Sequence, residues 1–333
     1  MSDPGPFRPA PWARGPNAQT LFAYLARPRP RLHWRPERLE LPDGDFVDLA
    51  HLGAAGPIVC LFHGLEGSLS SHYVGGLARN LVAAGLRVTF MHFRGCSGEP
   101  NRLPRAYHSG DTGDIRYLVD TLRRRDPNTP LAAVGFSLGG NALLKYLGER
   151  EANTPLAAAL AVSVPFDLDA CATRIDSGFS RVYQARLVRQ MQQSTRARAS
   201  RLGSLPIDME AMARARSFRE FDDAVTAPLH GFADARDYYA RASSAPYLSR
   251  IAVPTRLIQA RDDPFVGPGP VPSPDDVAPA VELDVSDHGG HVGFVAARNG
   301  LPLWWLEHSI PVWFRGALRD GPGPARQQCV GLG

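Results

Sequence analysis

Short apolar runs alternate with segments of helical spacing along most of this 333-residue chain. Runs of this kind are typical of strands that are buried on both faces of a parallel sheet. The segments between them are long enough for crossover helices, which would cover both faces of that sheet. The runs are residues 57–62 (PIVCLF), 86–91 (LRVTFM), 131–136 (LAAVGF), 157–164 (AAALAVSV), 253–260 (VPTRLIQA) and 280–286 (AVELDVS). The pattern predicts the α/β class, with a mostly parallel sheet between two layers of helices.

Two more strands are predicted before the first of these runs. Residues 38–41 (RLEL) have strand composition, and residues 45–52 (DFVDLAHL) alternate between apolar and polar positions. An Asp-Gly pair stands between them, which is a strong hairpin signal. The hairpin brings the predicted sheet to eight strands.

The same alternation sets the expected domain organisation. Residues 1–37 are rich in proline and arginine and show no periodicity, so we expect an extended arm packed over the domain. Residues 38–318 form the predicted domain, which closes with a helix over 302–318. Between about 165 and 244 the alternation stops, and Arg, Gln, Met and aromatic residues recur at helical spacing. This predicts a helical cap inserted between two strands, and we expect the tail, 319–333, to be disordered.

Arginine supplies nearly all of the positive charge. Lys145 is the only lysine among 37 basic residues, and the formal net charge is +4. Arginines gather at 27–38, 123–125 and 186–201, but no stacking aromatics or recognisable nucleic-acid module surround them. We interpret these clusters as solvated surface and the arginine bias as the codon preference of a GC-rich genome. Nucleic acid is therefore not an expected partner.

Cysteine usage and hydropathy point away from several other classes. The four cysteines have no metal-ligand spacing and are too sparse for a disulfide framework. They are Cys60, Cys96, Cys171 and Cys329. No apolar run approaches the roughly 18 residues of a membrane-spanning helix, and the N-terminal residues contain no apolar signal segment. We expect a cytoplasmic protein that needs no metal or cofactor and has no stable membrane anchor.

A Gly-x-Ser-x-Gly motif stands at the end of one predicted strand. Ser137 lies between Gly135 and Gly139, directly after the run 131–136 and before the amphipathic segment 138–150. A bare match occurs by chance in about one chain in ten of this length, and a serine could merely fill a glycine-rich turn. The strand–turn–helix context, however, is the one that a nucleophile elbow requires, because the tight turn exposes the serine hydroxyl at a helix N-terminus. We predict that Ser137 is a nucleophile.

A serine nucleophile needs a base and an acid, which follow it on this kind of sheet in the order acid, then histidine. The loops after the last two predicted strands offer Asp262 or Asp263 and His288 or His291. We favour His291, because it precedes the apolar sequence Val-Gly-Phe and can be packed with one edge facing the elbow. We favour Asp263, because the following Pro-Phe-Val can fold back to hold its carboxylate. Asp262 would then cap the turn.

The predicted nucleophile also needs donors for an oxyanion. One is the backbone N–H of Leu138, the residue after the nucleophile. The second should come from the loop after the first long parallel strand, 63–68 (HGLEGS), where we select the N–H of Leu65. His63 in the same loop is interpreted as structural, since neutral histidines often anchor loops by hydrogen bonds.

Several motifs together resemble the YheT-like branch of the α/β-hydrolases. The similarity runs from about Asn17 to Phe314, nearly the whole chain. The motifs that carry it are HGLEGS (63–68), FRGCSGEPNRLPRAYHSGD (93–111), GFSLGGN (135–141), FDDAVTAPLHGFADARDYYARAS (221–243), ARDDPF (260–265) and HGGHVGF (288–294). The Gly-x-Ser-x-Gly motif is shared by many hydrolases, whereas the other motifs in combination are far more specific.

The resemblance implies an α/β-hydrolase fold with a Ser–Asp–His triad, which falls by motif on Ser137, Asp263 and His291. It also implies hydrolysis of carboxylic esters with short or medium acyl chains, and relatives are associated with phospholipid or ester-synthesis chemistry. Eukaryotic relatives often carry an N-terminal membrane anchor, which we do not find in this sequence. We therefore expect a serine esterase that acts on small-molecule esters.

Two other functions are kept as alternatives. The same acyl-enzyme could be resolved by an alcohol, which would make the protein an acyltransferase or ester synthase. A binding protein with this fold is disfavoured, because such proteins usually lose a triad member.

Several further residues are given interpretations that the structure can test. Polar residues of the 93–111 loop are interpreted as a hydrogen-bonded scaffold, and Asn141 as a link between the elbow helix and a neighbouring loop. The loop residues concerned are Arg94, Cys96, Tyr107, His108 and Asp111. Asp222 and Asp223 are expected to form a hinge in the inserted helices or to cap them. Large side chains of the cap could line an acyl pocket or form the core of the cap itself. These are Tyr183, Met191, Met209, Met212 and Phe218.

Overall fold

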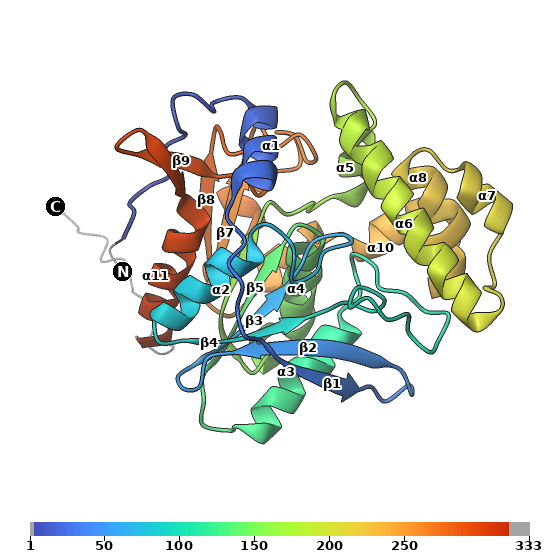
Figure 1. Cartoon of the computed structure of the whole chain (residues 1–333), viewed down its shortest axis with the longest axis horizontal. Helices are drawn as coiled ribbons and strands as arrows, with labels where there is room; N and C mark the ends of the chain where they lie inside the picture. The colour runs from blue at the N-terminus through green and yellow to red at the C-terminus, as the bar shows by residue number, and fades with distance from the viewer. Residues whose placement is uncertain (1–2, 320–333) are drawn as a thin grey trace.

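The computed structural model describes residues 3–319 and is built on one central sheet. The strand order is β1-β2-β4-β3-β5-β6-β7-β8 (Figure 1). The strands are β1 (Arg35–Glu40), β2 (Phe46–Leu52), β3 (Ile58–Phe62), β4 (Arg87–Met91), β5 (Leu131–Phe136), β6 (Leu156–Val162), β7 (Thr255–Ala260) and β8 (Val281–Ser286). Strand β2 is antiparallel to both of its neighbours, and every other pair in this sheet is parallel. The predicted α/β fold with a mostly parallel, eight-stranded sheet is confirmed.

Helices cover both faces of the sheet, and strand β3 shows how the sequence makes this possible. The covering helices are α2 (Val74–Ala83), α3 (Gly113–Arg125), α4 (Leu138–Arg150) and α11 (Trp305–Arg319). Successive side chains of a strand point to opposite faces. Cys60 and Phe62 belong to the core under α3 and α4, whereas Val59 and Leu61 belong to the core under α2 and α11. All of β3 is buried, which explains why its sequence is apolar throughout.

The expectation of an extended arm over residues 1–37 is wrong in two places. Helix α1 spans Pro16–Ala26, and strand β1 already begins at Arg35. Proline occupies the first helical position of α1, where its missing N–H costs no hydrogen bond. Only a few residues of the helix are buried, so the apolar periodicity of a core helix is weak there. The helix forms because it packs on distant parts of the chain.

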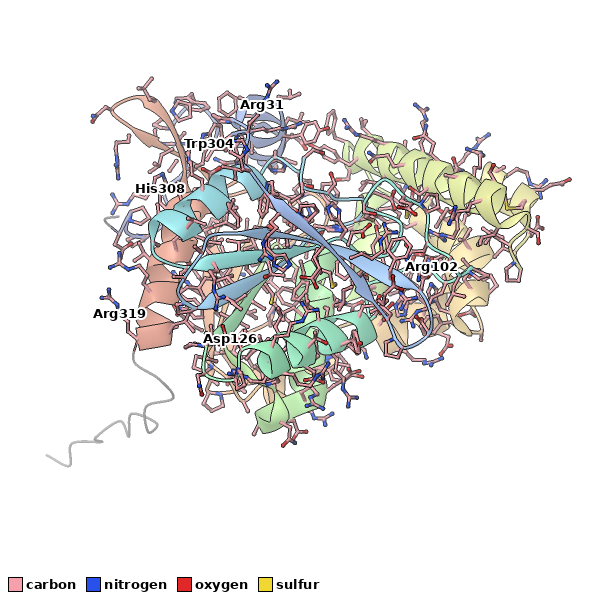
Figure 2. The ribbon with its side chains drawn as sticks, turned by 60° about the horizontal axis from the view of Figure 1, so that its bottom comes forward. Arg31, Arg102, Asp126, Trp304, His308 and Arg319 are labelled. Atoms are coloured by element: carbon pink, nitrogen blue, oxygen red, sulfur yellow. The ribbon has the colours of Figure 1, made fainter. Side chains whose placement is uncertain are left out.

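The closing helix starts later than expected and is preceded by a small hairpin. Strands β9 (Val295–Arg298) and β10 (Leu301–Trp304) pair with each other, so the helix predicted over 302–318 begins at Trp305. The turn Asn299-Gly300 has positive φ at both residues, as a tight two-residue hairpin requires. The Asn-Gly pair in the sequence could therefore have been used to predict this hairpin. Trp304 lies beside α1 (Figure 2), where its ring stacks on a phenylalanine of that helix.

The chain between β6 and β7 is helical and lies to one side of the sheet (Figure 1). Its elements are α5 (Leu168–Ile175), α6 (Ser180–Leu202), α7 (Met209–Arg214), α8 (Phe218–Phe221), a π-helical turn (Asp222–Thr226), α9 (Ala227–His230) and α10 (Ala235–Ala242). Within residues 3–319, no helix has the length and apolar character needed to cross a bilayer. Of the tail expected at 319–333, Arg319 ends α11 and the remainder lies outside the described residues.

Candidate active site

Ser137 occupies the sharp turn between β5 and α4. Its backbone has φ 52° and ψ −120°, a conformation that non-glycine residues rarely adopt. The turn requires glycine on both sides of the serine, because a larger residue would collide with the backbone. A Cβ on Gly139 would lie 2.4 Å from the carbonyl oxygen of His63, and one on Gly135 would lie 2.5 Å from that of Gly139. The strained turn holds the serine hydroxyl at the carboxyl edge of the sheet, next to the start of a helix.

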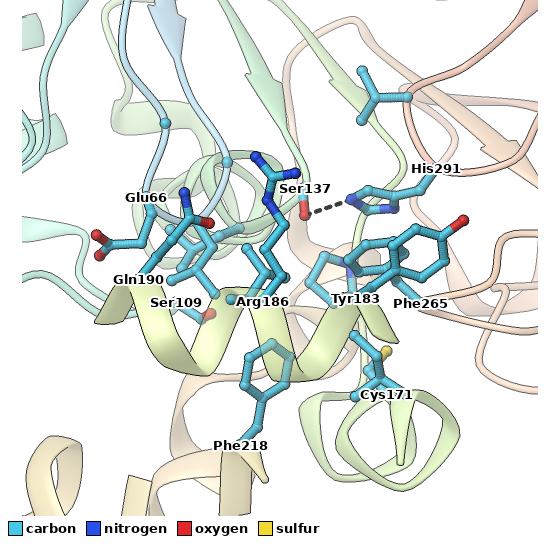
Figure 3. Close-up of a pocket in the computed structure, with 18 of the residues that line it drawn as sticks. Glu66, Ser109, Ser137, Cys171, Tyr183, Arg186, Gln190, Phe218, Phe265 and His291 are labelled. Carbon is cyan, nitrogen blue, oxygen red and sulfur yellow. Dashed lines mark hydrogen bonds between the residues drawn. The ribbon is translucent and has the colours of Figure 1, made fainter. Parts of the chain in front are cut away.

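His291 reaches this hydroxyl from the loop that follows β8. Its Nε2 lies 3.0 Å from Ser137 Oγ (Figure 3). The imidazole ring stacks on Phe265, with 4.1 Å between ring centroids. The backbone N–H of His291 donates to Thr20 Oγ1 on α1 at 2.9 Å. Ring and backbone are therefore both restrained, which keeps the imidazole aimed at the serine.

Asp263 and Asp262 have different roles in the neighbouring loop. Asp263 is 1% exposed, and its Oδ2 lies 2.8 Å from His291 Nδ1. Its other oxygen accepts the N–H of Phe265 at 2.8 Å, as expected of a loop that folds back over the carboxylate. Asp262 accepts the N–H of Gly290 at 2.9 Å and lies 3.3 Å from the exposed His288. The geometry brings Asp263 to the serine–histidine pair and uses Asp262 to brace the histidine loop.

The loop after β3 presents an unpaired N–H beside the elbow. The N–H groups on either side of Leu65 are used: that of Gly64 donates to the hydroxyl of Tyr73, and that of Glu66 donates to the hydroxyl of Tyr107. The N–H of Leu65 has no hydrogen-bond partner in residues 3–319. It is therefore available to a ligand in the pocket that Leu65 lines.

The second N–H predicted for an oxyanion belongs to the elbow itself. Leu138 is the first residue of α4, where an N–H has no intrahelical acceptor. The N–H of Ser137, by contrast, donates to the carbonyl of Val162 at 2.9 Å. Leu138 and Leu65 line the same pocket as Ser137. The two predicted donors and the predicted nucleophile thus belong to residues around one cavity.

His63 is a structural residue of the Leu65 loop. It is fully buried, its Nδ1 donates to the carbonyl of Gly64 at 2.7 Å, and its Nε2 accepts the N–H of Phe93 at 3.1 Å. This arrangement needs a neutral ring, and burial lowers the pKa of His63 to about 3. The imidazole therefore shapes the loop that contains Leu65.

The 93–111 loop is a hydrogen-bonded scaffold, as its polarity suggested. Arg94 is almost fully buried and forms two hydrogen bonds to Asp114, while its Nη1 lies 3.3 Å from Asp45. Asn141 on the elbow helix donates to the carbonyl of Ser109 at the end of this loop and to that of Ala242 in the cap. The scaffold joins the elbow, the loop and the cap.

A cavity of about 400 Å³ opens in front of Ser137, between the sheet and the cap. Its surface is mostly apolar, and much of it comes from α5 and α6. Among the large cap residues, Tyr183, Met191 and Phe218 line this cavity, and Figure 3 shows the Phe218 ring directed into it. Met209 and Met212 belong instead to a separate core within the cap. The sequence left open whether these side chains line a pocket or form the core of the cap. Some of them do the first and others the second.

Helix α1 and the residue after it, Arg27, hold the loop that carries His291, which the sequence did not reveal. Arg27 is buried and donates to the carbonyl of Gly293 at 2.6 Å, next to the histidine loop. Burial lowers its pKa to about 10. Gln19 accepts the N–H of Val295 at 2.6 Å and donates to the carbonyl of the same residue at 3.0 Å. Together with Thr20, these residues connect the helix to the loop that holds His291. In the sequence, only the proline at the start of the helix could have indicated that a helix forms here.

Within the part of the chain that the structure describes, no group of three or more His, Cys, Asp or Glu side chains could hold a metal ion. The cavity presents a serine hydroxyl in contact with a histidine, a buried carboxylate on the other side of that histidine, and two backbone N–H groups.

Comparison with known proteins places this geometry in a family. Residues 57–296 match the family defined by the alpha/beta hydrolase fold. The chain is 46% identical over 301 residues to the Escherichia coli (strain K12) protein named "Putative esterase YheT", a match that covers 89% of this chain and 88% of the relative. The chain belongs to the α/β-hydrolases, in their YheT-like branch, as its motifs suggested.

Two further likenesses are more distant. The chain is 34% identical over 262 residues to a Saccharomyces cerevisiae protein named "Monoacylglycerol lipase", covering 76% of this chain and 58% of the relative. Among solved structures, the Pyrococcus furiosus esterase Pf2001 superposes with a TM-score of 0.54 at 16% identity and covers 87% of this chain and 94% of that one. The structural likeness establishes the shared fold.

Proposed function

We propose that this protein hydrolyses carboxylic esters through an acyl-enzyme on Ser137, with His291 as the base and Asp263 as the orienting acid. The observation that carries the proposal is the unbroken contact from Asp263 Oδ2 to His291 Nδ1 (2.8 Å) and from His291 Nε2 to Ser137 Oγ (3.0 Å). An α/β-hydrolase relative named as an esterase, matched over most of both chains, supports the same reaction class.

In the first half of the reaction, Ser137 Oγ attacks the ester carbonyl and His291 Nε2 takes the hydroxyl proton. Asp263 accepts the Nδ1–H of His291, which fixes the tautomer whose Nε2 is free to act as a base and then stabilises the imidazolium. The tetrahedral intermediate places its negative oxygen between the N–H groups of Leu65 and Leu138. The ester C–O bond then breaks, and His291 returns its proton to the leaving alcohol.

In the second half, water attacks the acyl-enzyme. His291 accepts a proton from that water, the bond between the acyl carbon and Ser137 Oγ breaks, and the serine recovers its proton as the carboxylic acid leaves. No metal or cofactor is needed to balance either half-reaction. The same intermediate would form in transfer to an alcohol, so the ratio of acid to ester products in water–alcohol mixtures separates the two outcomes.

The decisive experiment is covalent labelling with a tagged fluorophosphonate. The wild-type protein should be labelled and the Ser137→Ala variant should not. The matched control is Ser70→Ala: this serine also lines the cavity, but its hydroxyl contacts Ser68, 2.7 Å away, and no histidine. Ser70→Ala should be labelled as fast as the wild type. A folded wild-type protein that is not labelled would overturn the activated-nucleophile assignment.

The apolar cavity supports a preference for short to medium acyl chains. Many of its apolar residues come from the cap, among them Leu168, Ala172, Ile175, Leu187, Met191 and Phe218. Turnover of p-nitrophenyl esters of increasing length should rise to an optimum and then fall. Phe218→Ala should move the optimum to longer chains and Phe218→Trp to shorter ones. An optimum that stays in place in both variants would show that the acyl chain does not occupy this part of the cavity.

A further inference from the structure

Two segments of the chain are strongly basic and contain no acidic residue. One is residues 4–36, and the other is α6 (Ser180–Leu202). Their arginines are Arg8, Arg14, Arg27, Arg29, Arg31 and Arg35 in the first and Arg181, Arg186, Arg189, Arg196, Arg198 and Arg201 in the second. The whole chain has a formal net charge of only +4, so positive charge is concentrated in these two places.

Most of these arginines lack a carboxylate partner, unlike many other arginines of the protein. Among residues 3–319, the only ion pairs within 4.0 Å that involve either segment are those of the buried Arg27 with Glu307 and of Arg181 with Asp176, the latter at 4.0 Å. On α6, Arg189 and Arg196 are exposed and lie seven residues apart, which places them on one face of the helix. The positive charge of that face is therefore free to meet an external anion.

The same two segments expose apolar side chains. Six large hydrophobic residues are exposed in the described part of the chain, and five of them belong to these segments or immediately precede α6. They are Trp12 (46% exposed), Leu21 (36%), Leu25 (77%), Phe179 (52%) and Val182 (58%), and Leu301 is the sixth. Single exposed hydrophobic residues are ordinary, but such a concentration is typical of a docking surface.

The two segments meet at the mouth of the cavity. Tyr183 on α6 donates to Asn17 Oδ1 on α1 at 2.9 Å, and Arg186 on α6 donates to the hydroxyl of Tyr24 on α1 at 2.5 Å. Tyr24, Arg29, Tyr183 and Arg186 all line the cavity, and Figure 3 shows Arg186 extending from α6 toward Ser137. Basic and aromatic side chains of both segments therefore form part of the cavity wall.

We propose that residues 4–36 and α6 together form a surface that docks on an anionic lipid layer and presents the cavity mouth to it. We call this surface the basic–apolar rim. Aliphatic side chains such as Leu25 and Val182 would enter the layer between the headgroups, while arginines bind the lipid phosphates, as in interfacial helices. The rim fits nucleic acid less well, because it exposes aliphatic residues and its two segments line an apolar cavity.

Docking in this position would select the substrate. An ester anchored in the lipid layer could pass from the layer into the cavity without crossing water, which favours lipid esters over freely soluble ones. This part of the inference rests on the proposed esterase function, whereas the docking itself does not depend on catalysis.

Docking is tested by co-sedimentation of the full-length Ser137→Ala variant with phosphatidylcholine vesicles that contain or lack phosphatidylglycerol. We expect binding to the anionic vesicles, weakening as salt is raised, and little binding to the neutral ones. Replacing Arg189 and Arg196 by glutamine should weaken binding about 30-fold, from the contribution expected of two arginines near an anionic surface. The double variant Leu25→Ser/Val182→Ser should remove the binding that persists at high salt.

The matched control removes two arginines from α3. Arg116 and Arg124 are exposed on that helix, and Figure 2 shows Asp126, just after α3, far from Arg31 beside α1. The variant Arg116→Gln/Arg124→Gln should bind vesicles like the parent protein. None of the replaced residues lines the cavity, so hydrolysis of a water-soluble p-nitrophenyl ester should be unchanged when the substitutions are made in the active protein.

Three results would overturn the inference: no binding to anionic vesicles, equal weakening in the α3 control, or tighter binding to a single-stranded oligonucleotide than to anionic vesicles at equal salt. Fluorophosphonate labelling is independent of all three. A protein that is labelled but does not dock would refute the rim alone, and one that docks but is not labelled would refute the esterase mechanism alone.

Discussion

The hydroxyl of Thr20 accepts a hydrogen bond from the backbone N–H of His291 at 2.9 Å, although the two residues are 271 positions apart in the chain. The same hydroxyl donates to the carbonyl of Pro16 within α1 at 2.8 Å. One side chain thus connects the N-terminal helix to the loop that carries the proposed catalytic base. Helix α1 is part of the framework of the candidate active site.

Replacing Thr20 by valine keeps the shape of the side chain and removes the acceptor. We expect kcat/KM for a short p-nitrophenyl ester to fall about 3- to 10-fold, which corresponds to one lost neutral hydrogen bond of about 1 kcal/mol. Thr20→Ser retains the hydroxyl and should restore most of the activity. Equal activity in the valine and serine variants would show that the contact does not position His291.

The two adjacent aspartates should respond very differently to substitution by asparagine. Asp263→Asn should lower kcat by about 10⁴-fold, because an amide favours the wrong histidine tautomer. Asp262→Asn should lower kcat less than about 10-fold, since Asp262 contacts the N–H of Gly290 and the exposed His288 instead. Steady-state kinetics of both variants on one ester decides the assignment. A larger loss in Asp262→Asn would reverse it.

The close approach of β3 to the elbow can be tested at Gly139. In Gly139→Ala the new methyl group would lie 2.4 Å and 2.6 Å from the backbone carbonyl oxygens of His63 and Phe62. Backbone cannot move aside as a flexible side chain does, so we expect the free energy of unfolding to fall by about 3 kcal/mol or more. Denaturant titration monitored by circular dichroism measures the change.

Gly316 provides the contrasting glycine. It lies in α11, and an added Cβ would meet no atom within 4 Å. Gly316→Ala should raise the free energy of unfolding by about 0.5–1 kcal/mol, because alanine loses less backbone entropy in a helix. Wild-type stability in Gly139→Ala would contradict the packing of the elbow described above.

Histidines whose pKa values are lowered in the folded state predict that the protein loses stability in mild acid. Burial lowers the pKa of His63 and of His108 to about 3 in the folded state, against about 6.5 in an unfolded chain. Between these values the unfolded state binds more protons, so the stability that the neutral rings contribute is complete above about pH 7 and is lost as the pH falls toward about 3. At about pH 5 each ring would cost up to about 2 kcal/mol of unfolding free energy.

The variant His108→Gln tests this linkage, because glutamine has no group that titrates in place of the imidazole. Urea unfolding at about pH 7 and about pH 5 should show a smaller acid-induced loss of unfolding free energy in the variant than in the wild type, by up to about 2 kcal/mol. The comparison between the two proteins cancels the other groups that titrate in this range. An identical loss in both would mean that His108 is not held neutral in the folded protein.

The sequence by itself determined the sheet and the position of the strained turn that carries the proposed nucleophile. Strands such as β3 and β5 are buried on both faces, so their residues must be apolar throughout, and this local signal is strong. The elbow at Ser137 needs glycines at fixed spacing for steric reasons, and those are also visible locally. Both features depend on neighbours in the chain, which is why they could be predicted.

Only the tertiary structure decided which of the paired candidates meet. His291 and His288 stand three residues apart in one loop, and both have an aspartate partner, yet only His291 contacts Ser137. Helix α1 was missed because its reason for folding lies in contacts to the loop that follows β8, such as that of Thr20 with His291. Contacts between segments hundreds of residues apart leave no periodic trace in either segment, since they depend on how the whole chain packs.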